Sequence, residues 1–389
     1  MAVGERPARI AFFDAYAHDA GAGLALRDIV ARIDRERFEP IALLARHGPL
    51  AGLLAEAGCP VEVLEPPPPL GVIGGGLATA GAWRKLRLGL ALVRYSSTIA
   101  RWLRAREIDV LHCNQTRAAF AAGPGARIAR VPVAWNVRIR ERLPQLVVRV
   151  AEACAETIIP LTERDFDGLP NERRLLARSI VIRNAVDIER FSPTRDQAAA
   201  RASVGVADDA PLILSAGVLV PRKGFDVAIR AMGAVAERLP DARLLIAGGE
   251  PAGGGCRAEL EALVAERDLA DAVTLLGPRD DMPELLAACD ALVLASRHEG
   301  DPAVVLEAMA SARPVVATPA AAAAVEDGAT GVVVPADGDG ALAEALIGLL
   351  SDPQAARRMG AVGRAVAEAR HDIRAMVRRY EDAWTRMLR

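Results

Sequence analysis

The stretch Ser296–Ala310, S-R-H-E-G-D-P-A-V-V-L-E-A-M-A, decides how the rest of this chain is interpreted. The apolar run Ala291–Ala295 precedes it and is typical of a buried strand. A short loop follows, and Pro302 stands where a helix can begin, because the N–H that proline lacks has no helical partner there. We therefore expect a strand, a loop and a helix N-terminus, with Glu299 in the loop and Glu307 in the helix.

The helix N-terminus expected here would favour a bound phosphate. Its first backbone N–H groups are free and its end carries partial positive charge. Two carboxylates beside such a site are unusual for phosphate binding alone. They fit a phosphate that carries hydroxyl-rich groups on both sides, such as a ribose and a sugar. The alternative is that the two glutamates have no shared role. The residues in the other loops of the chain distinguish between these two interpretations.

Composition predicts a globular protein of two domains. The chain has 389 residues, of which 52% are hydrophobic and 25% charged. None of its five cysteines forms a C-x-x-C pair, which argues against a zinc site and a disulfide framework and indicates a reducing compartment. Residues 1–16 lack an apolar signal segment, and no run of about 18 apolar residues occurs. We expect a cytoplasmic protein without a transmembrane helix.

Charge is distributed unevenly along the chain, although the net charge is only −2. Residues 1–185 contain 26 basic and 19 acidic side chains, whereas residues 186–389 contain 22 and 31. This difference fits two domains with different partners. We expect one domain over residues 1–185, a second over 186–372, and a C-terminal helix over 373–389 that packs back across the hinge.

Apolar strand-like runs alternate with helical patterns through both halves. We expect strands at 9–13, 40–45, 61–64, 110–113, 131–137 and 157–160, and again at 212–216, 243–247, 273–276, 291–295, 314–317 and 331–334. This alternation predicts an α/β protein whose parallel sheets are covered by helices on both faces. The loops at the carboxyl ends of parallel strands meet at one edge, where open α/β sheets bind ligands.

Several of these loops carry residues suited to a ligand. The loop Gly217–Gly224 contains Arg222 and Lys223, one of only two lysines in the chain. A lysine just before a helix suits a diphosphate, and an arginine beside it adds a bidentate donor. The alternative is an exposed basic turn. Asp280 and Asp281 are adjacent, but we do not expect a metal there because Asp280 can cap the next helix.

The first half carries weaker signals. The loop Asp14–Gly23 is rich in small residues and joins a strand to a helix, but it lacks a G-x-G-x-x-G fingerprint. His112, Asn136 and Arg138 stand at strand ends and are candidates for contact with a ligand. A structural role for His112 is the alternative.

Residues 83–106 form a helical pattern with six arginines, Lys85 and no acidic residue. Trp83, Leu86, Leu90, Val93 and Trp102 give it apolar surface. One interpretation is a solvated helix of an arginine-rich protein. The other is contact with an anionic membrane surface or with a lipid-phosphate acceptor.

Taken together, the motifs resemble the family-4 retaining glycosyltransferases, also called glycosyl transferases group 1, which have the GT-B fold. The resemblance covers nearly the whole chain and is stronger in the second half. It implies two Rossmann-like, doubly wound domains with parallel sheets that face each other across a cleft. The motifs that carry it are Glu299 and Glu307 with seven residues between them, Arg183–Asp187, Phe191–Pro193, Lys223–Gly224, Ala247–Gly249, Leu276–Gly277 and Glu326–Gly331.

The resemblance also implies roles for individual residues. Lys223 neutralises the donor diphosphate, and backbone amides near Val304 and Val305 cradle it. Glu307 holds the ribose hydroxyls, and Glu299 contacts the transferred sugar. Two further residues would complete the nucleotide site, namely Gly21, which lets its loop approach the phosphates, and Arg279, which lines the base.

Two positions depart from the family pattern. Val218 stands where an arginine is common, and we expect Arg222 in the same loop to compensate. Asn136 stands where a histidine commonly contacts the donor sugar. We expect Arg138 or His112 to take over part of that role on the acceptor side.

The function expected from the resemblance is retaining transfer of a sugar from a nucleoside diphosphate sugar, with UDP or GDP as the nucleotide, to a glycan, a lipid-linked or a small-molecule acceptor. We expect it to serve cell-envelope polysaccharide or glycolipid biosynthesis. No metal, other cofactor or nucleic acid is expected, and contact with the inner face of the membrane would be peripheral. Two alternatives stay open, a non-catalytic GT-B relative that binds nucleotide or a partner transferase, and a nucleotide-sugar epimerase.

Overall fold

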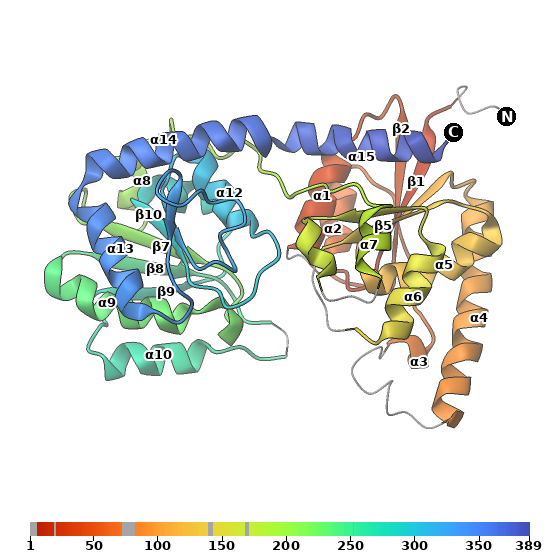
Figure 1. Ribbon diagram of the computed structural model, residues 1–389, viewed down its shortest axis with the longest axis horizontal. Coiled ribbons are helices and arrows are strands. Elements are labelled where there is room, and N and C mark those ends of the chain that lie inside the picture. Colours follow the sequence, from red (N-terminus) through yellow and green to blue (C-terminus); the bar gives the residue numbers. More distant parts are fainter. Residues whose placement is uncertain (1–5, 19–20, 72–81, 139–142, 168–170, 252) are drawn as a thin grey trace. The chain divides into compact units, whose positions relative to one another are not determined.

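The structure is a computed structural model that describes residues 6–18, 21–71, 82–138, 143–167, 171–251 and 253–389, without the side chains of residues 69, 71, 82, 84 and 85. It divides into two compact units (Figure 1). Unit 1 comprises Met1–Arg183 and Arg374–Arg389, and unit 2 comprises Asn184–Ile373. Unit 1 contains 31 basic and 21 acidic residues, and unit 2 contains 17 and 29. The units therefore differ in charge more than the two sequence halves do.

Among the described residues, each unit is built on a parallel sheet of six strands. The order β3-β2-β1-β4-β5-β6 in unit 1 is repeated in unit 2 as β9-β8-β7-β10-β11-β12. This is the doubly wound order of the Rossmann fold. The strands of unit 1 are β1 (Ala8–Asp14), β2 (Phe38–Leu44), β3 (Val61–Val63), β4 (Val110–Cys113), β5 (Val133–Val137) and β6 (Thr157–Pro160). Those of unit 2 are β7 (Leu212–Ala216), β8 (Arg243–Ala247), β9 (Val273–Gly277), β10 (Ala291–Leu294), β11 (Val315–Ala317) and β12 (Gly331–Val333).

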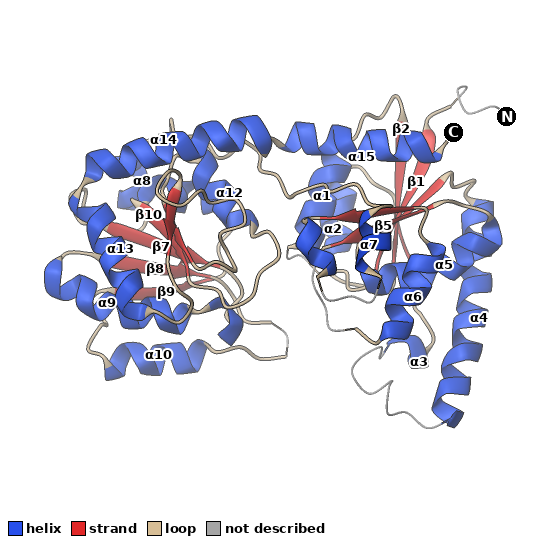
Figure 2. Cartoon of the chain, in the orientation of Figure 1, coloured by secondary structure: helices blue, strands red, loops and turns tan. Residues whose placement is uncertain are grey.

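Helices cover both faces of each sheet, as Figure 2 shows. Those of unit 1 are α1 (Ala22–Arg32), α2 (Leu50–Glu56), α3 (Pro68–Gly71), α4 (Ala82–Ala105), α5 (Thr116–Ala129), α6 (Gln145–Cys154), η1 (Glu163–Phe166), α7 (Glu172–Leu176) and α15 (Ile373–Met387). Those of unit 2 are α8 (Gln197–Ser203), η2 (Pro221–Lys223), α9 (Phe225–Arg238), α10 (Arg257–Glu266), α11 (Met282–Ala288), α12 (Ala303–Ala310), α13 (Asp339–Ser351) and α14 (Pro353–Arg370).

The expected fold class and the twelve expected strands are confirmed. Because both faces of a parallel sheet are buried, its strands are continuous apolar runs, which is why they could be found from sequence. One detail differs from the expectation. Pro302 is the residue before the helix and has extended backbone, so α12 begins at Ala303.

The C-terminal helix α15 belongs to unit 1 and is one of its most deeply packed elements. Tyr380 and Trp384 are fully buried. The Trp384 ring meets those of Phe12 on β1 and Phe38 on β2 edge-on, with ring centres 5.6 Å apart in both cases. Such aromatic pairs add to the stabilisation from buried area, so α15 is an integral part of the unit 1 core.

Candidate functional site

The strand order of unit 2 reverses between β7 and β10, and the loops that follow these two strands meet at that point. Lys223, at the end of the first loop, places its Nζ 2.5 Å from Oε1 of Glu299 in the second. Both side chains are largely buried, with 12% and 9% of their surfaces exposed. The fold thus joins two residues that are 76 positions apart in the sequence.

Glu299 is held from two further sides. The Ser296 hydroxyl donates a hydrogen bond of 2.9 Å to its Oε1. Arg222 lies 3.6 Å from its Oε2 and also donates to the His298 carbonyl. The carboxylate is therefore shared by two cations, and this corner of the sheet edge keeps one net positive charge.

Glycines make room for this arrangement. Gly217 directly follows β7 with φ of 149°, and a Cβ there would lie 3.2 Å from Cε of Lys223. A Cβ on Gly248, after β8, would lie 1.8 Å from the Gly217 carbonyl oxygen. Only glycine lets these backbones and the lysine side chain come so close.

Arg297 fastens the loop after β10 to helix α9. Its guanidinium lies 2.8 Å from Asp226 and 2.6 Å from Asp337. Burial alone would raise the pKa of Asp226, but hydrogen bonds from Arg297 and Arg230 outweigh it and hold that pKa below its usual value. The Glu299 loop is thereby fixed at its base.

Helix α12 follows this loop with an N-terminus that no side chain caps. The Val305 amide already donates to the Pro302 carbonyl at 3.1 Å. The amides of Ala303 and Val304 have no acceptor within the helix, as in any first turn. Glu307 lies one turn further on and is partly exposed. The helix thus brings first-turn amides and a carboxylate to the edge that holds Lys223.

Asp301 has a structural role that sequence reasoning missed. Its Oδ2 accepts from the Asn184 amide at 2.9 Å, and its carbonyl accepts from the Asn184 side chain at 2.6 Å. The Arg183–Asp187 motif therefore anchors the end of the Glu299 loop. No feature of the sequence indicated this contact, because Asn184 and Asp301 are 117 positions apart.

Arg279 and Gly21 are the two remaining residues that the resemblance assigns to the nucleotide site. Arg279 follows β9 and bonds to Asp281 at 2.7 Å, which holds the pKa of Asp281 below its usual value. Gly21 belongs to unit 1, where it precedes α1 with φ of 36°, and a Cβ there would meet nothing within 4 Å. Both roles that the resemblance implies for them stay predictions.

Unit 1 has a polar cluster at its own reversal point, between β1 and β4. The buried Asp14 accepts from Asn114 at 2.7 Å and from Gln115 at 2.5 Å. Its other oxygen accepts from two amides of the loop that follows β1. Arg138 joins the cluster through a 3.0 Å bond to Asn114. Asp14, at the very end of a strand, is the residue here that sequence reasoning overlooked.

His112 and Asn136 are fully buried beneath α15. The Asn136 amide donates to the Tyr380 hydroxyl at 2.9 Å, and the Trp384 indole donates to Nδ1 of His112 at 3.3 Å. Neither side chain reaches the surface of unit 1 in this structure. Arg138 is only slightly more accessible. The acceptor-side role expected for these residues stays a prediction.

The burial of His112 gives an expected pH effect on stability. Burial, with the charge of Arg138 as a second cause, lowers the pKa of His112 to about 3. An unfolded histidine titrates near 6.5, so below that pH the unfolded chain takes up a proton that the folded chain does not. The stabilisation by neutral His112 is complete above about pH 6.5 and is lost as the pH falls toward 3. Between pH 7 and pH 5 this effect should lower the free energy of unfolding by about 2 kcal/mol.

Urea unfolding of the wild type and of His112→Gln at pH 7 and pH 5 measures this loss. The variant should be less stable at pH 7 but should lose about 2 kcal/mol less than the wild type on acidification, because glutamine does not titrate. Equal losses in the two proteins would contradict the buried neutral histidine.

Within the described residues, no group of three or more His, Cys, Asp or Glu side chains is placed to hold a metal ion. In the same part of the chain, none of the helices is both long and apolar enough to cross a bilayer.

Comparison with known proteins places this architecture in a class. HepE of Anabaena, solved with UDP and glucose, superposes with a TM-score of 0.80 at 25% identity and covers 97% of this chain and 99% of its own. The fold is that of the GT-B glycosyltransferases, as expected. Residues 196–366, which make up most of unit 2, match the model of the family described as Glycosyl transferases group 1.

Two curated relatives are also glycosyltransferases. The alpha-D-kanosaminyltransferase of Streptomyces kanamyceticus is 29% identical over 77% of this chain and 82% of its own length. The GDP-mannose-dependent monoacylated alpha-(1-6)-phosphatidylinositol monomannoside mannosyltransferase of Corynebacterium glutamicum is 39% identical, but over 48% of this chain and 50% of its own length. The chain thus matches only about half of that mannosyltransferase.

Proposed function

We propose that the protein is a retaining glycosyltransferase that transfers a sugar from a nucleoside diphosphate sugar to a glycan, a lipid-linked or a small-molecule acceptor. A role in cell-envelope polysaccharide or glycolipid biosynthesis, at the inner face of the membrane, is part of the proposal. One observation is the main support for this proposal. Lys223, Glu299 and the uncapped N-terminus of α12 lie together where the strand order of the unit 2 sheet reverses. A diphosphate between two hydroxyl-bearing groups fits this combination of charges.

In this proposal Lys223 and the α12 amides stabilise the charge that develops on the leaving diphosphate. Fixed donors aimed at such charge commonly contribute more to catalysis than any other single effect. The Lys223 ammonium has three N–H groups, so it can keep its bond to Glu299 and still donate to a phosphate oxygen. Glu299, fixed by Ser296 and Lys223, then faces the sugar as an acceptor of hydroxyl hydrogen bonds. A metal ion has no assigned task in this scheme.

Retention of configuration at the anomeric carbon fits a front-face reaction. The bond between the anomeric carbon and the diphosphate oxygen breaks, the acceptor oxygen bonds to that carbon on the same face, and its proton passes to the leaving phosphate oxygen. We assign the two glutamates to binding, in contrast to glycosidases, whose paired carboxylates act as acid and nucleophile.

A thermal-shift screen with UDP, GDP, ADP and their sugars tests the donor class. A ligand at a hundred times its Kd stabilises the folded state by about 2.7 kcal/mol, which corresponds to a rise in Tm of about 5–10 °C. The hit is then assayed for transfer. Binding without any transfer or hydrolysis would favour the non-catalytic relative, and donor conversion without an acceptor would favour the epimerase.

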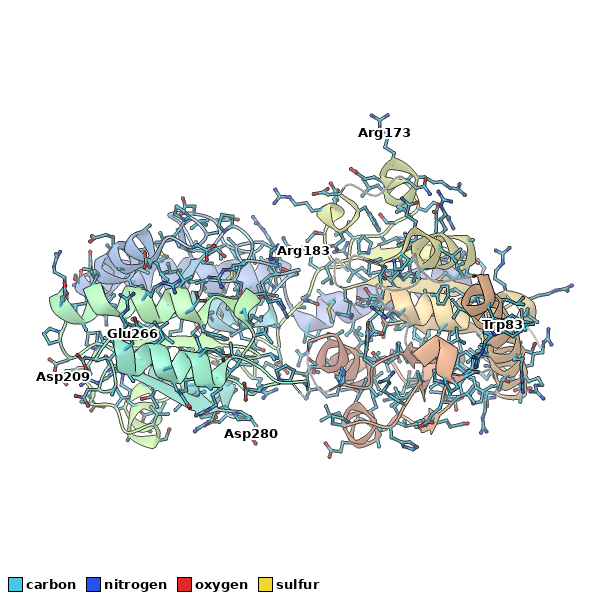
Figure 3. All side chains as sticks on the ribbon, turned by 90° about the horizontal axis from the view of Figure 1, so that it is seen from below. Trp83, Arg173, Arg183, Asp209, Glu266 and Asp280 are labelled. Carbon is cyan, nitrogen blue, oxygen red and sulfur yellow. The ribbon has the colours of Figure 1, made fainter. Side chains whose placement is uncertain are left out.

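Glu307→Gln should raise the donor KM by about tenfold or more and change kcat much less. The proposed ribose contact is a charge-assisted hydrogen bond, which contributes about 1.5–3 kcal/mol to both ground and transition states. The matched control is Glu266→Gln on the exposed side of α10 (labelled in Figure 3), which should leave both constants unchanged. An unaltered donor KM in Glu307→Gln would remove Glu307 from the site.

A further inference from the structure

The outward face of helix α4 carries an exposed apolar stripe. Trp83, Leu86, Leu90 and Val93 are 71%, 52%, 58% and 64% exposed. Their spacing of three and four residues puts them on one side of the helix, over about 15 Å. Among the described residues, eight large hydrophobic side chains are at least 37% exposed, and four of these eight lie in this one stripe, so it is not a random scatter.

Arginines flank this stripe. Arg87 and Arg94 are exposed on the same outward face, and α4 contains no Asp or Glu. Within the described residues, no carboxylate forms an ion pair with either of them. Arg106, by contrast, lies beyond the helix and is paired with Glu62 at 2.7 Å, so it is not part of this surface. We call Trp83, Leu86, Arg87, Leu90, Val93 and Arg94 the α4 surface.

The two halves of α4 have different surroundings. The C-terminal half packs tightly on α5, where a Cβ on Gly125 would lie 2.7 Å from Cβ of Ile99. At the middle, the Tyr95 hydroxyl donates to the Leu64 carbonyl at 2.7 Å, just past the end of β3. Because α4 runs back along the sheet toward the start of β4, the turns before Tyr95 extend past the carboxyl edge of the strands. Figure 1 shows these first turns projecting from unit 1.

We propose that the α4 surface docks on an anionic lipid bilayer. The four apolar side chains would enter the boundary between headgroups and acyl chains, and Arg87 and Arg94 would bind lipid phosphates. The charge of unit 1 favours an anionic bilayer as the partner, because unit 1 has ten more basic than acidic residues. A second copy of the chain would set arginines of one α4 against arginines of the other. The proposal does not depend on the reaction that the protein catalyses.

Vesicle sedimentation of the full chain, with phosphatidylcholine alone and mixed with phosphatidylglycerol, tests this docking. The wild type should pellet with the mixed vesicles and remain in solution with the neutral ones. Trp83→Ser combined with Leu90→Ser should lower the partition coefficient by about a hundredfold. Arg87→Glu combined with Arg94→Glu should lower binding to the mixed vesicles by about tenfold or more.

The chain offers matched controls. Leu146→Ser on α6 and Arg173→Glu on α7 change exposed residues of unit 1 outside the α4 surface, and Figure 3 shows Arg173 well apart from Trp83. Both should bind vesicles as the wild type does, and circular dichroism should show all variants folded. Trp83 is also a natural probe, because Trp135 and Trp384 are fully buried and Trp102 is partly buried. Its emission should shift to the blue with mixed vesicles.

Three results would overturn the proposal. The first is a wild type that stays in solution with both kinds of vesicle. The second is unchanged pelleting of the α4 variants. The third is a wild-type dimer, detected by light scattering, that becomes a monomer in Trp83→Ser with Leu90→Ser, since the stripe would then serve self-association.

Discussion

Lys223→Ala is expected to lower kcat/KM for the nucleoside diphosphate sugar by about a hundredfold or more. Removing one fixed donor from developing negative charge costs roughly that much in other enzymes, and Lys223 is the most buried cation at the unit 2 reversal point. Steady-state kinetics with the donor found by thermal shift would measure the loss. Full activity in Lys223→Ala would refute the site.

The same substitution has a stability cost that must be separated from catalysis. The Glu299 carboxylate, which is only 9% exposed, would keep just Ser296 and the more distant Arg222 as partners. We expect the free energy of unfolding to fall by about 1–3 kcal/mol as a result. Adding Glu299→Gln removes the uncompensated charge. The double variant should regain most of the lost Tm but none of the lost activity. Arg238→Ala is the matched control, because it removes an exposed cation at the end of helix α9, which follows Lys223; it should change neither Tm nor activity.

Gly224→Ala should lower both the stability of the protein and its affinity for the donor. Gly224 has φ of 69°, and a Cβ there would lie 2.0 Å from the Ala295 carbonyl oxygen, at the end of β10. Left-handed backbone costs alanine about 1–2 kcal/mol, and the clash adds to it, so we expect a total of about 2–4 kcal/mol. Calorimetry should show a Tm lower by about 5–15 °C.

Donor binding should weaken at the same time. Gly224 separates Lys223 from α9, and relief of the clash must move the lysine loop away from the loop that carries Glu299. Gly233→Ala is the matched control, because Gly233 lies inside α9 and a Cβ there would meet nothing within 4 Å. It should raise stability by about 0.5–1 kcal/mol and leave donor binding intact. Similar behaviour of the two variants would mean that the close contact with Ala295 has no effect.

Sequence reasoning recovered the elements of this fold because their signal is local. Runs such as Leu212–Ala216 and Ala291–Leu294 are buried on both sides, so nearly every residue in them is apolar, and no knowledge of neighbours is needed to find them. The glycines at 217, 224 and 248 were equally visible, since each follows a strand or precedes a helix. Their consequences were not visible, because the carbonyls that exclude a side chain come from other strands and loops.

The site was recovered in part for the same reason. Lys223, Glu299 and Glu307 stood out as charged residues at expected strand ends or helix starts, and the structure brings the first two into contact. Asp301 and Asp14 were missed, because a buried carboxylate that binds backbone amides has no distinctive neighbours in sequence. His112 was singled out at a strand end, yet α15 returns from the far end of the chain to bury it.

The sequence by itself determined the α/β alternation, the parallel sheets, the glycine-bearing turns and the choice of Lys223 and the two glutamates, since each follows from local apolar pattern or residue chemistry. Only the tertiary structure decided which loops meet. The reversal of strand order puts β7 beside β10 and so pairs Lys223 with Glu299 across 76 residues, and the packing of α15 makes His112 and Asn136 part of the interior. Strand order and long-range packing depend on how whole surfaces fit together, and no short stretch of sequence contains that information.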